Sequence, residues 1–350
     1  MRILVTGGSG FIGSALVHLL VETGHSVINF DKMTYAANPA SLAGLEWTGR
    51  YAPVLADVTD RAALAATLAR HQPDAIIHLA AESHVDRSID GPLPFVATNT
   101  TGTAMVLEAA RTYWNGLEGA QRDGFRVLHV STDEVFGSLG PEGRFHEGSP
   151  YQPNSPYAAS KAAADHLARA WHVTYGLPVI VSNCSNNYGP RQFPEKLIPL
   201  MILNGLNGLA LPVYGDGRQV RDWLHVEDHA RGLLAMLERG VPGESYLLGG
   251  GCDIANIEVV HSVSDALDEM VPDRLGSRRR LIRHVTDRPG HDRRYAVDPA
   301  KAARDLGWLP KASFADGIRA TVRWYLDNEE WWAPLLGEDS PWTRRLGLAS

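Results

Sequence analysis

Short, mostly apolar segments alternate with helical patterns through the first half of the chain, and this alternation restricts the possible folds most. The strand-like segments cover residues 3–6, 26–30, 52–56, 75–79, 126–130 and 178–182. Helical spacing of apolar residues follows at 12–20, 62–70, 94–113 and 157–175. Continuous apolar strands with helical connections are typical of a parallel sheet covered on both faces. We therefore expect an α/β fold with a doubly wound parallel sheet.

The pattern becomes looser after residue 183, where Gly and Pro are more frequent and strands are shorter. We expect residues 1–185 to form the domain that contains the sheet, with segments near 225–250 returning to it. Residues 186–350 are expected to form mainly a smaller C-terminal α/β lobe. In such sheets ligands bind beyond the carboxyl ends of the strands, so the polar residues at those ends are the first candidates for a site.

Charge and composition exclude several classes of function. The chain has 33 Lys and Arg residues against 40 Asp and Glu, a net charge of −7, so it carries no electrostatic signature of nucleic-acid binding. No apolar run approaches the roughly 20 residues that span a membrane. Two cysteines make no disulfide framework and fit a reducing compartment, so we expect a cytoplasmic protein. No metal site is expected.

Three glycines, Gly7, Gly10 and Gly13, join the first strand to the first helix. At that position, backbone N–H groups can approach a diphosphate at the helix N-terminus. Asp31 ends the second strand, where a carboxylate can bind ribose hydroxyls and repel a 2′-phosphate. NAD is therefore favoured over NADP. Asp57 and Val58 end the third strand near the expected adenine, although a simple turn would explain them equally well.

Tyr157 and Lys161 are four residues apart and so share one face of a helix. A nearby ammonium favours phenolate and is expected to lower the pKa of Tyr157, which could then take a proton from an alcohol. Thr132, Asp133 and Glu134 follow the strand at 126–130. Two carboxylates there could serve two atoms of one ligand. The alternative is that Asp133 caps a turn and Glu134 is exposed.

These motifs together resemble the extended short-chain dehydrogenase/reductases that act on nucleotide sugars, and among them the dTDP-glucose 4,6-dehydratases. The similar segments are GGSGFIGS (7–14), DKMTYAAN (31–38), LAAESHVDRSI (79–89), STDEVFG (131–137), YAASK (157–161), SNCSNNYGPRQFPEKLIPL (182–200), YGDGRQVRDWLHVEDH (214–229) and DRPGHDRRYA (287–296). Asp133 is the most specific residue, because the resemblance places no acidic pair in sugar epimerases and a small polar residue at that position in GDP-mannose dehydratases.

The resemblance implies a Rossmann-type NAD-binding domain, a nucleotide-sugar-binding lobe and a homodimer. It also implies the reaction: dehydration of dTDP-glucose to dTDP-4-keto-6-deoxyglucose by C4 oxidation, elimination of water across C5 and C6, and return of hydride to C6. Tyr157 would be the base at C4, Glu134 the base at C5 and Asp133 the acid at the C6 oxygen. Thr132 would orient the C4 hydroxyl, and Lys161 would hold the ribose.

The resemblance further implies two sets of binding residues. The cofactor set is Gly7, Gly10, Phe11, Ile12, Gly13, Asp31, Lys32, Thr34, Asp57, Val58, Leu79, Ala80, Ala81, Ser83, Thr98, Tyr157, Lys161 and Asn187. The substrate set is Ser83, Thr132, Asp133, Glu134, Asn186, Lys196, Leu197, Pro212, Val213, Tyr214, Arg221, Asn256, Arg288 and His291. Lys196 and Arg221 would neutralise the diphosphate, with plain surface charge as the alternative.

Two positions depart from the expected pattern: Phe136 stands in place of Tyr, and Ala37 in place of Gly. Neither is an acid–base group. Cys184 is interpreted as structural. The competing hypotheses are a sugar 4-epimerase or a UDP-sugar dehydratase on the same scaffold, and an NAD-binding regulator without turnover.

Overall fold

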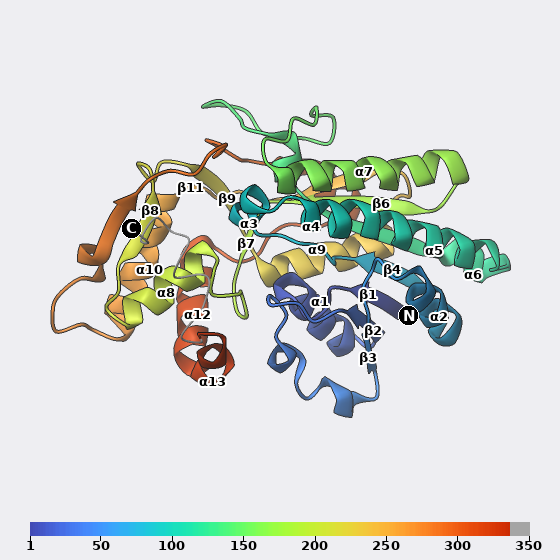
Figure 1. Cartoon of the computed structure of the whole chain (residues 1–350), viewed down its shortest axis with the longest axis horizontal. Coiled ribbons are helices and arrows are strands. Elements are labelled where there is room, and N and C mark those ends of the chain that lie inside the picture. Colours follow the sequence, from blue (N-terminus) through green and yellow to red (C-terminus); the bar gives the residue numbers. More distant parts are fainter. Residues whose placement is uncertain (337–350) are drawn as a thin grey trace.

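A seven-stranded sheet forms the centre of the computed structural model, which describes residues 1–336 (Figure 1). The strands follow the order β3 (Tyr51–Leu55), β2 (Ser26–Asp31), β1 (Arg2–Thr6), β4 (Ala75–His78), β5 (Arg126–Thr132), β6 (Val179–Cys184) and β10 (Ser245–Leu248). Every neighbouring pair is parallel. The predicted doubly wound parallel sheet is confirmed.

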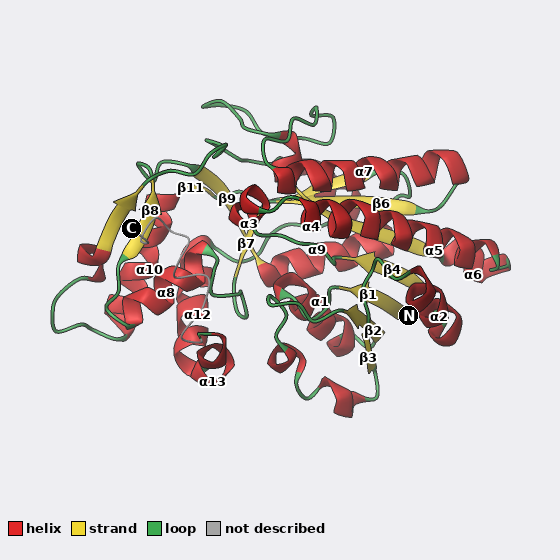
Figure 2. Ribbon diagram, viewed as in Figure 1, coloured by secondary structure: helices red, strands yellow, loops and turns green. Residues whose placement is uncertain are grey.

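Helices cover both faces of this sheet (Figure 2). One face carries α1 (Phe11–Glu22), α9 (Val226–Arg239) and α11 (Ala300–Leu306), and the other carries α2 (Arg61–His71), α5 (Thr103–Asn115) and α7 (Pro156–Tyr175). Successive strand residues point to opposite sides. Ile3 and Val5 therefore pack in the first layer and Leu4 in the second, all of them buried. This double burial explains why the strands lack polar alternation.

The helix expected at 94–113 is longer and not uniform. It consists of α4 (Leu93–Phe95), a π-helical segment over Val96–Gly102, and α5. The π-helical segment brings Gly102 against Val58, where a Cβ would lie 2.8 Å from a methyl carbon of that valine. Such irregular turns are common beside functional sites. Here Thr98, within the segment, lines the main pocket.

The connections on the two sides of β1 create the crevice in which a ligand can bind. From β1 the chain moves outward through α1 to β2 and β3, whereas β4 pairs with the opposite edge of β1 and leads toward β5. The loops that follow β1 and β4 therefore diverge at their carboxyl ends. Open α/β sheets bind their ligands at this kind of switch point. The loop after β4 carries the short helix α3 (Val85–Asp90), and α6 (Gly119–Gly124) precedes β5.

A smaller lobe with its own apolar core lies beside the carboxyl ends of the strands (Figure 1). Its sheets are β7 (Asn186–Tyr188), β9 (Val220–His225) and β11 (Asp253–Ala255), and the pair β8 (Leu211–Tyr214) with β12 (Ile282–Val285). Its helices are α8 (Leu197–Leu206), α10 (Asn256–Met270), α12 (Phe314–Asp327) and α13 (Glu329–Trp332).

Three elements of the second half belong to the layers of the large sheet. Strand β10 adds to the β6 edge, α9 packs against α1, and α11 packs against β10 and α9. The boundary near residue 185 remains a prediction. Among residues 1–336, no helix is both long and apolar enough to cross a membrane. Of the tail beyond Trp332, residues 337–350 lie outside the described part of the chain.

Candidate active site

The turn between β1 and α1 passes so close to neighbouring backbone that only glycine fits at two positions. Gly7 has a φ of +73°, and a Cβ there would lie 2.7 Å from the backbone nitrogen of Ala80. A Cβ on Gly13 would overlap the carbonyl oxygen of Gly7. Gly10 offers no side chain to cap α1, so the first N–H groups of the helix have no side-chain cap. This cradle fits the diphosphate of NAD.

Replacing Gly13 by Ala is expected to weaken NAD binding at least about tenfold and to destabilise the fold by about 1–3 kcal/mol, because the new methyl group forces the turn apart. Isothermal titration with NAD and thermal unfolding would measure both effects. Gly124→Ala is the matched control, since no atom lies within 4 Å of a Cβ at that position. Equal NAD affinity in the Gly13 and Gly124 variants would contradict the cradle.

Asp31 is held rigidly at the end of β2. Its carboxylate accepts hydrogen bonds from the backbone N–H groups of Ser9 at 2.9 Å and Met33 at 2.8 Å, and it lines the pocket. A fixed carboxylate in this place suits ribose hydroxyls and disfavours a 2′-phosphate. The geometry therefore fits NAD better than NADP.

Asp57 lies next to two lining residues, and its contact with the adenine remains a prediction. The structure leaves it out of the pocket lining, although Val58 beside it is included. Its carboxylate pairs with Lys32 at 3.3 Å and accepts the N–H of Thr59 at 2.9 Å. Asp57 therefore forms an ion pair with Lys32, and Lys32 itself lines the pocket.

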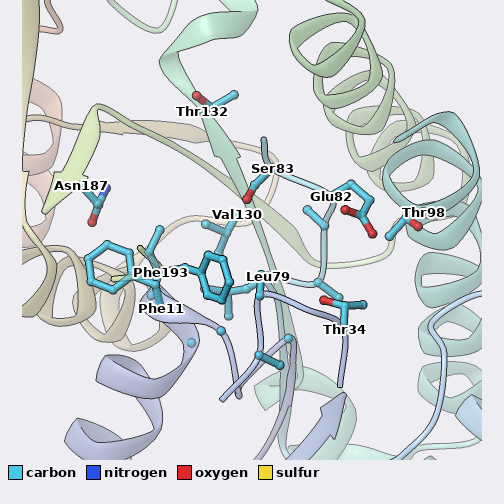
Figure 3. A pocket seen from close by; sticks show the side chains of 18 of the residues that line it. Phe11, Thr34, Leu79, Glu82, Ser83, Thr98, Val130, Thr132, Asn187 and Phe193 are labelled. Atoms are coloured by element: carbon cyan, nitrogen blue, oxygen red, sulfur yellow. The ribbon is translucent and has the colours of Figure 1, made fainter. Parts of the chain in front are cut away.

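One cleft of about 300 Å³ connects the glycine turn with the acid–base residues (Figure 3). Every residue of the cofactor set except Asp57 lines it, together with six of the substrate set: Ser83, Thr132, Asp133, Glu134, Asn186 and Lys196. In Figure 3, Phe11, Phe193 and Asn187 lie on one side of the cavity, and Thr34, Glu82 and Thr98 on the other. The lining therefore brings the predicted cofactor residues and the acid–base residues together in one cavity.

Thr132 ends β5 and caps the short 3-10 turn Asp133–Phe136. Its hydroxyl accepts the backbone N–H of Glu134 at 3.2 Å. The alternative in which Asp133 caps the turn and Glu134 is exposed is wrong: Asp133 is 1% exposed and Glu134 lines the pocket. Because Thr132 satisfies the turn, both carboxyl groups remain available for a ligand.

The two carboxyl groups have different electrostatic surroundings. Burial raises the pKa of Asp133 well above its usual value, and the negative charge of Glu134 adds to this shift. One carboxyl oxygen of Asp133 is buried without a hydrogen-bond partner among residues 1–336. Burial also raises the pKa of Glu134, but three cations, Arg288, Arg221 and Lys196, oppose that shift. Asp133 is therefore suited to act as an acid and Glu134 as a base.

Tyr157 and Lys161 project from α7 into the same cleft, and the Lys161 ammonium bonds the backbone. Lys161 donates from Nζ to the carbonyl oxygen of Val130 at 2.8 Å. Burial raises the pKa of Tyr157 well above its usual value, and Glu134 raises it further, whereas a hydrogen bond with Thr132 lowers it. The expectation of a lowered pKa is thus wrong in this structure, because desolvation and the negative charge of Glu134 raise the pKa of Tyr157.

Asp165, one turn beyond Lys161 on α7, anchors the strand ends that carry the site. It is buried and accepts four hydrogen bonds: from His129 at 3.0 Å, Ser131 at 2.9 Å, Tyr151 at 2.8 Å and Asn183 at 3.1 Å. Burial alone would raise the pKa of Asp165, but these bonds and nearby positive charge lower it. The residue is therefore an ionised carboxylate inside the protein.

Replacing Asp165 by Ala is expected to cost about 3–5 kcal/mol of folding stability, because four buried donors lose their acceptor. Urea unfolding would measure the loss. The control Asp265→Ala removes a carboxylate that is 54% exposed and is expected to change stability by less than about 0.5 kcal/mol. Similar midpoints for the two variants would show that the network contributes little.

Lys196 and Arg221 both lie near the acids, in different settings. Lys196 donates from Nζ to the carbonyl oxygen of Ser83 at 2.9 Å. Arg221 is only 4% exposed and its guanidinium lies 4.2 Å from the ring centroid of Tyr295. Plain surface charge does not describe Arg221, because desolvating a guanidinium without a function is costly.

The remaining substrate-set residues lie outside the pocket lining. Arg288 and Tyr214 both donate to Asp86, at 2.9 and 3.0 Å, and His291 bonds Asp287 at 2.6 Å. The others are placed in the lobe: Leu197 begins α8, Pro212 and Val213 lie in β8, and Asn256 begins α10. Their contact with a substrate remains a prediction.

Several pocket residues were not expected from the sequence: Phe30, Ala36, Ala37, Ala56, Glu82, Val130, Ser131, Cys184, Ser185, Gln192, Phe193 and Glu195. Five of these residues belong to the motif 182–200. The length of that motif could have indicated that more of its residues line the site than the ones predicted.

Cys184 lines the cleft in addition to packing in the core. Burial raises its pKa to about 12. It is therefore a neutral thiol.

Comparison with known proteins gives consistent matches. Residues 4–321 match the family model described as GDP-mannose 4,6 dehydratase. A dTDP-glucose 4,6-dehydratase of Escherichia coli is 54% identical, over 99% of both chains. The dTDP-glucose 4,6-dehydratase of Streptomyces venezuelae, solved with NAD bound, is 48% identical with a TM-score of 0.87, over 96% of this chain and all of that one. A UDP-glucose 4-epimerase of Thermus thermophilus in complex with NAD is 29% identical with a TM-score of 0.82, over 94% and 100%.

Proposed function

The chain belongs to the GDP-mannose 4,6-dehydratase family, and we propose that within this family it converts dTDP-glucose to dTDP-4-keto-6-deoxyglucose with NAD as its cofactor. The reaction is a dehydration, so the enzyme is a hydro-lyase. A dTDP-sugar is its substrate. When bound, NAD⁺ supplies the hydride acceptor for C4 and later returns that hydride to C6.

The observation that carries this proposal is the pair Asp133 and Glu134 in one cleft with Tyr157. A 4-epimerase needs only a base at C4. Loss of water across C5 and C6 needs in addition a base for the C5 proton and an acid for the C6 oxygen. The opposed surroundings of the two carboxyl groups supply both roles.

In the first step Tyr157 takes the proton of the C4 hydroxyl. The hydroxyl of Thr132 bonds Tyr157 and is placed to orient the sugar oxygen. Lys161 contributes positive charge in the same part of the cleft, although burial lowers its pKa. Binding of a positively charged ring beside Tyr157 would offset the shift that burial imposes on the phenol.

In the second step the C4 ketone makes the C5 proton acidic, and Glu134 removes it. Asp133, which is protonated, donates its proton to the departing C6 oxygen, so that the leaving group is water rather than hydroxide. Reprotonation at C5 would complete the product, together with the hydride that bound NAD would supply to C6. The acid must be protonated in the resting protein, and the buried position of Asp133 supports that state.

Binding of the dTDP diphosphate is proposed to involve Lys196 and Arg221. Both cations lower the pKa of Glu134, so they lie within electrostatic reach of the reacting end of the cleft. Arg binds diphosphates well because its planar guanidinium can make two hydrogen bonds at once.

We also propose a cytoplasmic homodimer. Exposed apolar side chains on the sheet-covering helices support the dimer: Leu93 and Val96 on the α4–α5 helix, and Val173 and Tyr175 on α7. Two free cysteines support a reducing compartment. Light scattering of the purified protein would measure the oligomer, and a monomer at micromolar concentration would refute it.

The direct test is incubation of the purified protein with dTDP-glucose, first without and then with added NAD⁺. The expected product has lost one water by mass and shows the base-induced absorbance of a 4-keto sugar, with no net reduction of NAD⁺. A product of unchanged mass would indicate epimerisation and refute the roles of Asp133 and Glu134. If the protein converted UDP-glucose and not dTDP-glucose, the assigned nucleobase of the substrate would be uracil instead of thymine.

A further inference from the structure

Glu195 lies at the rim of the cofactor cleft and holds together two side chains from distant parts of the chain. Its carboxylate accepts hydrogen bonds from Arg87 at 3.1 and 3.2 Å, and from the hydroxyl of Tyr35 at 3.2 Å. The Glu195 side chain is only 5% exposed. None of the three residues is needed for the acid–base chemistry.

The contacts bridge segments that line the cleft from different directions. Tyr35 lies between Thr34 and Ala36, which both line the cleft, and Glu195 follows the lining residue Phe193. In Figure 3, Thr34 and Phe193 lie on opposite sides of the cavity. Tyr35 and Glu195 are 160 residues apart in the sequence, so their hydrogen bond joins two distant segments of the chain.

Two ring contacts complete the arrangement. The guanidinium of Arg87 lies 3.7 Å from the ring centroid of Tyr35, and the rings of Tyr35 and Phe193 meet edge to face at 5.6 Å. Tyr35 is 38% exposed, whereas Glu195 faces the cleft. The group thus lies between the cavity and solvent.

We propose that Tyr35, Arg87 and Glu195 form a clasp that must open for NAD to enter or leave, and that retains NAD through repeated turnovers. The inference rests on the proposed function, in which the hydride taken from a sugar returns to the same sugar. Such a cycle needs no cofactor exchange, and loss of the reduced cofactor would stop it. The three side chains are positioning residues, because they act on the loops and not on the reacting atoms.

The test measures the release of labelled NAD from the full-length protein after dilution into excess unlabelled NAD. Arg87→Gln and Glu195→Gln are each expected to release NAD about tenfold faster, since each removes the charge-assisted pair. The double variant should release NAD no faster than the faster single variant, because both changes break the same contact. Tyr35→Phe keeps the ring packing and removes only the hydroxyl, so the rate of NAD release should increase less than in the other variants. This variant tests the group with little risk of a folding defect.

Arg279→Gln is the matched control. Arg279 also makes a two-pronged pair with a carboxylate, Asp265, but on the outer surface of α10. Its NAD release should equal that of the parent. Release from the Arg87 variant within twofold of the parent, or a double variant whose acceleration is the product of the two single effects, would overturn the clasp alone. A parent protein that binds no NAD would overturn the proposed function and the clasp together.

Discussion

Replacing Tyr157 by Phe is expected to lower kcat on the order of a thousandfold, because the C4 hydroxyl loses its base. Phe keeps the ring contact with Phe95, 6.4 Å between centroids, so the fold should be unaffected. Since burial and Glu134 raise the pKa of Tyr157, the parent enzyme should speed up as the pH rises and phenolate forms. The variant should lack this increase. Steady-state rates across pH, with dTDP-glucose saturating, would measure both effects.

The suitable control is Tyr151→Phe, which removes a phenol hydroxyl that bonds Asp165 at 2.8 Å, outside the pocket lining. Its kcat should fall less than about tenfold. Deuterium at C4 of the substrate should slow the Tyr157 variant, because C4 oxidation then limits turnover. If the Tyr157 variant kept the parent's pH dependence, another group would have to be the base at C4.

The large sheet was predictable because its strands are buried on both faces, which leaves mostly apolar segments such as 75–79 in the sequence. The π-helical segment over Val96–Gly102 was not. One extra residue in a turn hardly changes an i, i+3, i+4 pattern, and the close approach of Gly102 to Val58 that accompanies the segment is a tertiary contact. The position of β10 at the sheet edge depends on pairing with β6, which the sequence signals only by a return of apolar segments.

Within the site, motifs located the residues well but did not give their electrostatics. A spacing of four residues places Tyr157 and Lys161 on one helix face, yet it contains no information on burial, and burial determines the direction of the Tyr157 pKa. The strand-end rule also does not reveal that Asp57 pairs with Lys32, and the role of Asp57 at the adenine stays a prediction. The role of Glu195 depends on Tyr35 and Arg87, which no local pattern connects to it.

Replacing Asp133 by Asn is expected to lower kcat about 100-fold or more, because the C6 oxygen would have to leave without a proton. The C4 step should persist, since Tyr157 and Thr132 are unchanged. Deuterium at C4 should therefore have little effect on the variant, in contrast to Tyr157→Phe, as loss of water becomes the slow step. An unchanged rate of 4-keto-6-deoxy product formation would refute the acid role.

The same substitution should stabilise the folded protein, which separates a chemical effect from a folding defect. Burial raises the pKa of Asp133 in the folded state, so the folded protein holds a proton that the unfolded chain releases above a pH of about 4. Parent stability therefore falls as the pH rises from there toward the folded pKa. The amide in the Asp133→Asn variant does not titrate, so the variant should gain stability over the parent more at pH 8 than at pH 5. Thermal unfolding at both pH values would measure the difference. A gain that did not grow with pH would mean that Asp133 is ionised in the resting protein, and a proton donor at C6 would then have to be sought elsewhere in the cleft.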